Sequence, residues 1–137
     1  MGRSVLLAVA AASMLAIGVM ANEKPSDAYV KSMKETNAAS QSLKKSVEAK
    51  DYDAVAKDAA TLKTLFTGTE EFWTARKTDD AIAAAKAGVT AATDLETAAK
   101  AKNAEGVATA SKAVAATCKT CHDAHRERLP DGTSEIK

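Results

Sequence analysis

Apolar residues recur at alternating intervals of three and four positions through much of this chain, and this periodicity restricts its fold more than any other feature. The clearest run consists of Tyr52, Val55, Ala59, Leu62 and Phe66. Such spacing places the apolar side chains along one face of an α-helix, as in the seam of a helix bundle. Alanine and lysine are abundant and long runs of β-branched residues are absent, which favours helix throughout.

Helix boundary signals divide the chain after residue 25 into four segments. The first, 26–50, contains neither glycine nor proline. Asp51 and Asp53 suit the start of a second helix, and Gly68 is expected to end it. Within the first helix the large apolar residues leave a gap at 37–40, where the side chains are small or polar. This gap leaves room for a bulky guest.

The second half of the chain carries similar signals. Thr78, followed by two aspartates, is expected to open a third helix that runs to about Lys102. Asn103 is expected to cap a fourth helix that stops near Leu129, ahead of a Pro-Asp-Gly turn. Four amphipathic helices joined by mostly short connections predict an all-α fold, an antiparallel four-helix bundle.

The one longer link is predicted between the second and third helices, over 67–77. It carries Phe72 and Trp73. Large aromatic residues at a helix junction usually complete a core rather than bind a ligand, so we expect these two to plug the end of the bundle.

The first 21 residues have the features of a secretory signal peptide: Arg3 near the start, an apolar run over 5–19, and small residues before a cut after Ala21. The run is shorter than the ~20 apolar residues that span a membrane, which favours cleavage over an uncleaved membrane anchor. The predicted mature chain, 22–137, is then a single domain of 116 of the 137 residues, exported to the periplasm.

The predicted mature chain carries 18 basic and 18 acidic side chains, because the signal peptide removes Arg3 and no acidic residue. Its lysines are spread along every segment and form no block. This balance gives no reason to expect a nucleic-acid partner, nor a membrane partner once the signal peptide is cleaved. The sequence leaves open whether the protein is a monomer or a homodimer.

Cys118 and Cys121 are the only cysteines, and His122 follows them directly in the motif CKTCH. A disulfide between them would close a very small loop and would stabilise the fold little. A thioredoxin-like redox pair belongs at a helix N-terminus, whereas this pair lies near the other end of a helix. A zinc site would need a second ligand segment, because these three residues and His125 share one helical face.

The remaining interpretation is covalent attachment of one haem c, for which C-x-x-C-H is the signature. Cys118 and Cys121 would form thioethers with the haem vinyl groups, and His122 would bind the iron from the proximal side. The i, i+3, i+4 spacing places the three side chains on one helical face, as a macrocycle lying against the helix requires. A haem would also fill a core that alanine alone leaves thin, so the haem-free protein is expected to be poorly ordered.

The candidate for the second axial ligand of the haem iron is Met33, the only methionine of the predicted mature chain. His125 lies one turn beyond His122 on the same helix and cannot reach the opposite side of the haem plane. Met33 lies on the inward face of the first predicted helix, so it is the candidate distal iron ligand. A core methionine that fills an irregular gap is the alternative. His125 itself is expected to be an exposed surface residue.

These residues resemble the class II c-type cytochromes, the cytochrome c′ family together with its low-spin, Met-ligated members. The resemblance rests on the segment CKTCHDAHR near the end of the final helix, on four helices over the predicted mature chain, and on a first helix with a methionine. It implies a haem held by Cys118 and Cys121, with His122 as the proximal ligand and Met33 facing the iron.

The resemblance also implies a place for Arg126 beside the proximal face of the haem. The chain departs from the family in three respects. Family members often have an aromatic residue where this chain has His125, the link between the middle helices is shorter than usual, and the tail 129–137 is additional.

The function that we expect is that of a periplasmic electron carrier without enzymatic activity, which exchanges electrons with redox partner proteins. The alternative is a five-coordinate cytochrome c′-type protein that binds small gases such as NO or CO. Ligation of the iron by Met33 distinguishes the two. A third interpretation is an extracellular helical binding module in which the C-x-x-C-H motif is accidental. Enzymatic catalysis is the weakest of the readings, because the sequence has no obvious buried acid/base pair.

Overall fold

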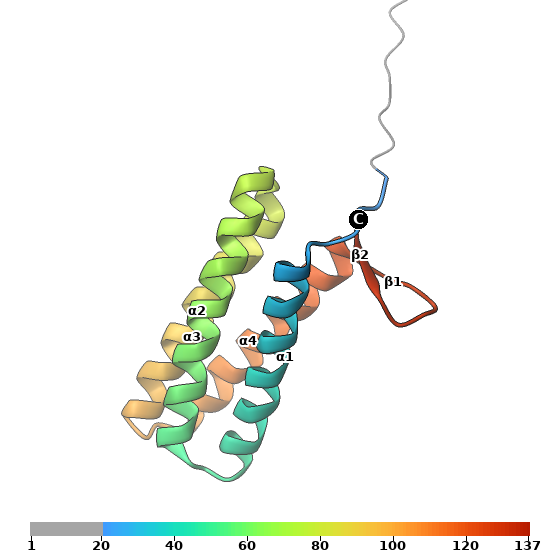
Figure 1. Cartoon of the computed structure of the whole chain (residues 1–137). Helices are drawn as coiled ribbons and strands as arrows, with labels where there is room; N and C mark the ends of the chain where they lie inside the picture. Colours follow the sequence, from blue (N-terminus) through green and yellow to red (C-terminus); the bar gives the residue numbers. More distant parts are fainter. Residues whose placement is uncertain (1–20) are drawn as a thin grey trace, which may run out of the picture.

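The computed structural model describes residues 21–137, and the predicted signal peptide, apart from Ala21, lies outside the described residues. The described chain forms four helices and a short two-stranded hairpin (Figure 1). The elements are α1 (Asp27–Glu48), α2 (Tyr52–Arg76), α3 (Asp79–Lys100), α4 (Ala104–His125), β1 (Arg126–Arg128) and β2 (Ser134–Ile136). The prediction of a four-helix fold is confirmed. None of the described helices is long and apolar enough to cross a membrane.

Three of the four helices begin at side chains that cap them. Ser26, Asp51 and Asn103 each accept a hydrogen bond from the backbone N–H three residues further on, at 3.2, 3.0 and 3.0 Å. Each bond satisfies one of the free donors at a helix N-terminus. Thr78 precedes α3 as predicted but makes no such bond. Local cap chemistry therefore sets these helix starts.

The connections between the helices are two or three residues long, and each contains a lysine in the left-handed region. Lys50, Lys77 and Lys102 have φ values of 55°, 56° and 53°. A left-handed residue directly after a helix turns the chain sharply and satisfies the last carbonyls. The α1–α2 connection lies at one end of the bundle and the α2–α3 connection at the other (Figure 1).

The predicted end of the second helix at Gly68 is wrong, because α2 continues through it and the expected link 67–77 is helical up to its last residue. Trp73, together with the polar Thr69, extends the buried face of α2 beyond Phe66. Burial of the Trp73 ring outweighs the ~1 kcal/mol that a glycine costs inside a helix. Trp73 completes the core as expected, but from a helix and not from a link.

The predicted end of the fourth helix near Leu129 is also wrong, because α4 ends at His125. Arg126 adopts an extended backbone (φ −122°, ψ 124°), and β1 pairs with β2 in an antiparallel hairpin. Gly132, with φ 85°, allows the turn between the strands. The additional tail is thus an ordered part of the fold.

The hairpin joins the two described ends of the chain. The backbone of Glu23 exchanges two hydrogen bonds with Ile136, of 2.7 and 2.8 Å. The residues before α1 therefore lie beside β2, next to the end of α4 (Figure 1).

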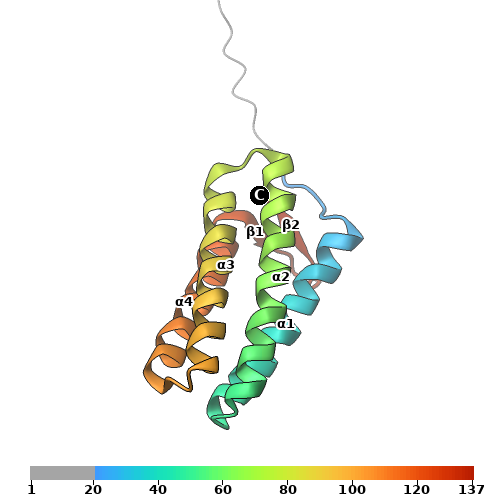
Figure 2. The ribbon, with the colours of Figure 1, turned by 90° about the vertical axis from the view of Figure 1, so that its left-hand side faces the viewer.

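The helices pack in the order of the chain. α2 contacts α1 and α3, and α3 contacts α4, whereas α1 and α4 hardly touch (Figure 2). The largest fully buried side chains are Val55 and Leu62 of α2 and Leu95 of α3. The core therefore lies along α2 and α3, and space remains between α1 and α4.

Gly88 allows α3 to approach α2 closely. A Cβ atom at this position would lie 2.9 Å from atoms of the Phe66 ring, closer than side chains pack. Gly88 is part of the buried face of α3, between Ala85 and Ala92. The Phe66 ring can thus lie directly on the α3 backbone.

Candidate functional site

The space between α1 and α4 is a cavity of about 670 Å³, within the ~300–1,000 Å³ range of cofactor and small-molecule sites. α1 contributes one wall, α4 with the start of β1 the other, and α2 and α3 the floor. The residues on its walls include Tyr29, Met33, Thr36, Asn37, Ser40, Leu43, Val114, Cys118, Cys121, His122 and Arg126, with Phe66, Thr69 and Ala85 on the floor. All five site residues predicted from the sequence thus border one cavity.

On the α4 wall, Cys118 and Cys121 have free thiols and are half-buried, as is His122. The two cysteines are separated by about 4.5 Å along the helix axis, and all three residues lie on one face. Burial raises the pKa of both thiols above its ordinary value. Reactive thiolates have lowered pKa values, so this environment does not favour thiol–disulfide exchange.

The pKa of His122 is lowered, first by burial and then by the nearby guanidinium of Arg126. The lowered pKa favours the neutral imidazole, which is the form that binds metal ions. Arg126 borders the cavity at the end of α4.

On the α1 wall, Met33 is half-buried and lies beside the predicted gap at 37–40. The hydroxyls of Thr36 and Ser40 donate to the carbonyls of Ser32 and Thr36, both at 2.8 Å. These side chains fold back on their own helix and need no partner across the cavity. Asn37 and Ser40 of the predicted gap border the cavity, whereas Ala39 is buried in the core.

A second cavity, of about 900 Å³, adjoins the first under the β1–β2 hairpin. Met33, Cys121, His122 and Arg126 border both cavities. The wall of the second cavity also includes Trp73 of α2. The open space therefore continues past the side chains of Met33 and His122 towards the tail of the chain.

An aromatic cluster lies beside the end of the cavity nearest the N-terminal end of α1. Tyr29 stacks on Phe72, with ring centroids 4.0 Å apart and an angle of 24°, and meets Trp73 edge to face at 6.2 Å. Burial raises the pKa of Tyr29 to about 12. Nothing in the sequence indicated that the rings of Tyr29, Phe72 and Trp73 meet beside the cavity.

The expectation that His125 is an exposed surface residue is wrong. Its side chain is 13% exposed, its ring centroid lies 4.9 Å from that of Trp73, and its Nε2 lies 2.9 Å from a carboxylate oxygen of Asp80. As the last residue of α4, His125 packs against the end of α2 and the start of α3. It is thus held between Trp73 and Asp80.

The donor atoms around the cavity fit a haem c better than a zinc ion. Among the described residues, no group of three or more His, Cys, Asp or Glu side chains is placed to hold a metal ion, as a structural zinc site needs. Two thiols on one helical face, an imidazole beside them and a thioether on the opposite helix are the side chains that a covalently attached haem c would use.

Comparisons with known proteins add no relative. No family model, no curated protein and no solved structure matches this chain.

Proposed function

We propose that this protein is a c-type cytochrome that carries electrons, an antiparallel four-helix bundle with one covalently bound haem c, similar to the class II cytochromes. The observation that carries this proposal is the cavity between α1 and α4. The motif residues Cys118, Cys121 and His122 border it from one side, and Met33 borders it from the other. This arrangement gives each donor of the proposed site a role.

Cys118 and Cys121 would hold the haem through thioether bonds, and the neutral imidazole of His122 would be the proximal ligand. Met33 would be the distal ligand, which raises the reduction potential and leaves no open site for a substrate. Burial, and then the charge of Arg126, lowers the pKa of His122 and favours the neutral imidazole. When bound, the haem supplies a one-electron iron couple.

We further propose that the chain is exported to the periplasm, that the signal peptide is cut after Ala21, and that the partners are redox proteins and not nucleic acid or membrane. The mass and N-terminal sequence of the purified protein test the cut. The packed core of α2 and α3 beneath the cavity floor would support electron transfer, because a packed site changes little when its charge changes. Fully buried Val55, Leu62 and Leu95 provide this packing.

The test is the visible absorption of protein expressed with a cytochrome maturation system, in the ferric and ferrous states, with and without CO. We expect a sulfur–iron charge-transfer band in the ferric protein and no response to CO. Met33→Ala should lose this band and bind CO. Val47→Ala, which trims another cavity residue on α1 but removes no donor atom, is the matched control and should do neither. A colourless product would contradict haem attachment.

A second candidate function is that of a five-coordinate, gas-binding cytochrome. The observation that favours it is the second cavity, because Met33 borders about 900 Å³ of further space into which its flexible side chain could turn. In that case wild-type protein binds CO, and Met33→Ala leaves the spectrum unchanged.

A further inference from the structure

We propose that the ion pair between Glu23 and Arg76 is a latch that fixes α1 relative to α4 and so positions Met33 across the cavity from His122. This inference rests on the proposed function, because it concerns the distal ligand of the proposed haem.

The N-terminal half of α1 needs such a support. α1 packs on α2 and hardly touches α4, and its short connection to α2 lies at the far end of the helix (Figure 1). The end that carries Tyr29 and Met33 borders the cavity and not a packed neighbour on α4. A helix held at one end and on one side can tilt, which would change the width of the cavity at Met33.

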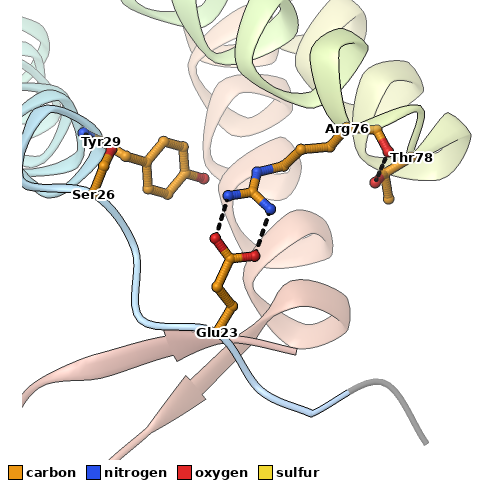
Figure 3. Close-up of polar contacts among 5 residues, drawn as sticks. All are labelled: Glu23, Ser26, Tyr29, Arg76 and Thr78. Atoms are coloured by element: carbon orange, nitrogen blue, oxygen red, sulfur yellow. Dashed lines mark hydrogen bonds and ion pairs between the residues drawn. The ribbon is translucent and has the colours of Figure 1, made fainter. Parts of the chain in front are cut away.

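The ion pair has the geometry of a strong contact. The carboxylate of Glu23 accepts two hydrogen bonds from the guanidinium of Arg76, both at 2.7 Å (Figure 3). Paired bonds of this kind fix orientation as well as distance. Arg76 is held from a second side, because its guanidinium carbon lies 4.5 Å from the centroid of the Phe72 ring.

The same contacts connect the pair to α1. Phe72 stacks on Tyr29, whose ring extends from α1 towards Arg76 (Figure 3). Tyr29 precedes Met33 by four residues, so the two side chains lie on one face of α1, one turn apart. Arg76 and Phe72 therefore support the turn of α1 that presents Met33.

The backbone of Glu23 connects the pair to α4. Its two hydrogen bonds with Ile136 attach it to β2, and β2 pairs with β1, which continues directly from α4 after His125. One residue thus contacts α2 through its side chain and the continuation of α4 through its backbone. Because Glu23 lies in the segment that leads directly into α1, these contacts hold the start of α1 between α2 and the continuation of α4.

The latch is suited to positioning and adds little to folding. The side chains of Glu23 and Arg76 are 54% and 29% exposed, and exposed ion pairs contribute little to stability. Loss of the pair should therefore leave the protein folded while it changes the position and mobility of α1.

The experiment compares Glu23→Ala with Glu35→Ala in the as-purified mature protein. Glu35→Ala also removes an ion pair, the one with Lys31 at 3.9 Å, but this pair lies within α1 and away from the cavity. Hydrogen exchange of the α1 amides and the sulfur–iron charge-transfer band are measured for both variants. We expect Glu23→Ala to raise exchange at residues 27–36 about two- to fivefold and to weaken the sulfur–iron charge-transfer band, with no change in either for Glu35→Ala.

Arg76→Lys provides a rescue test, because lysine keeps the charge but cannot form the paired hydrogen bonds. It should give an effect between those of wild type and Arg76→Ala. If Glu23→Ala behaves like Glu35→Ala in both exchange and spectrum, the latch is overturned and the proposed function stands. If Met33→Ala leaves the wild-type spectrum unchanged, ligation by Met33 is overturned, and with it the claim that the latch positions a ligand.

Discussion

Gly88 and Gly68 offer a matched test of the close contact between α2 and α3. Both glycines lie inside helices, Gly88 in α3 and Gly68 in α2. A Cβ atom at Gly88 would lie 2.9 Å from the Phe66 ring, whereas a Cβ atom at Gly68 would meet nothing within 4 Å. The same substitution, Gly→Ala, therefore changes helix propensity equally at both sites and adds a steric conflict at only one.

The expected magnitudes follow from these two terms. Alanine is more favourable than glycine in a helix interior by ~1 kcal/mol, so Gly68→Ala should stabilise the protein by about that amount. At Gly88 the overpacking of a core contact costs roughly 1–3 kcal/mol, which offsets or exceeds the gain. The two variants should thus differ by about 1–3 kcal/mol. Because Phe66 also forms part of the cavity floor, Gly88→Ala should disturb the proposed haem site as well.

Thermal unfolding followed by far-UV circular dichroism measures this difference. For a domain of this size, about 1 kcal/mol corresponds to a change in Tm of roughly 4 °C, so Gly88→Ala should unfold about 4–12 °C below Gly68→Ala. Equal stabilisation by the two substitutions would refute the close packing of Phe66 on the α3 backbone.

Three further predictions concern a helix cap and two titrating groups. Asn103→Ala should destabilise the protein by about 1 kcal/mol in denaturant unfolding, because it removes a cap hydrogen bond. Thr78→Ala removes no cap hydrogen bond and should cost less. Equal costs of the two substitutions would contradict this account. The pKa of Tyr29 is raised from 10.0 to about 12, so its contribution to stability is present below pH 10 and is lost as the pH rises towards 12. NMR of labelled tyrosine rings, with Tyr29→Phe as the control, should show one late-titrating ring. Arg76 lowers the pKa of Glu23, so the latch is intact above the ordinary carboxyl range and is lost as the pH falls through the lowered pKa. Hydrogen exchange in α1 should then rise in acid, and less so in Glu23→Ala.

The helix starts could be predicted because their causes are local. Asp51 and Asn103 cap the residues that directly follow them, and this chemistry depends on a few neighbours in the sequence. The prediction that the second helix ends at Gly68 was wrong because this helix end depends on contacts with distant segments. A glycine weakens a helix by a small local amount, whereas Trp73, five residues later, gains more by burial in a core formed by other segments. That stripe through Thr69 and Trp73 was visible in the sequence, but its burial was not.

The candidate site, too, could be predicted from the sequence only in part. Spacing alone places Cys118, Cys121 and His122 on one helical face, because the geometry of an α-helix is fixed. The sequence identified Met33 as the remaining soft donor, but it could not show that Met33 borders the same cavity as the motif. That depends on how α1 and α4 are held apart.

By itself, then, the sequence determined the four amphipathic helices, their starts and the cluster of thiols and imidazole on the last one, because these follow from periodicity and local hydrogen bonds. The tertiary structure decided the cavity, the contact of Gly88 with Phe66, the burial of His125 and the contact of Glu23 with Arg76. Glu23 and Arg76 are 53 residues apart in the chain. Contacts between such distant residues depend on the packing of whole helices, and no local pattern of residues encodes them.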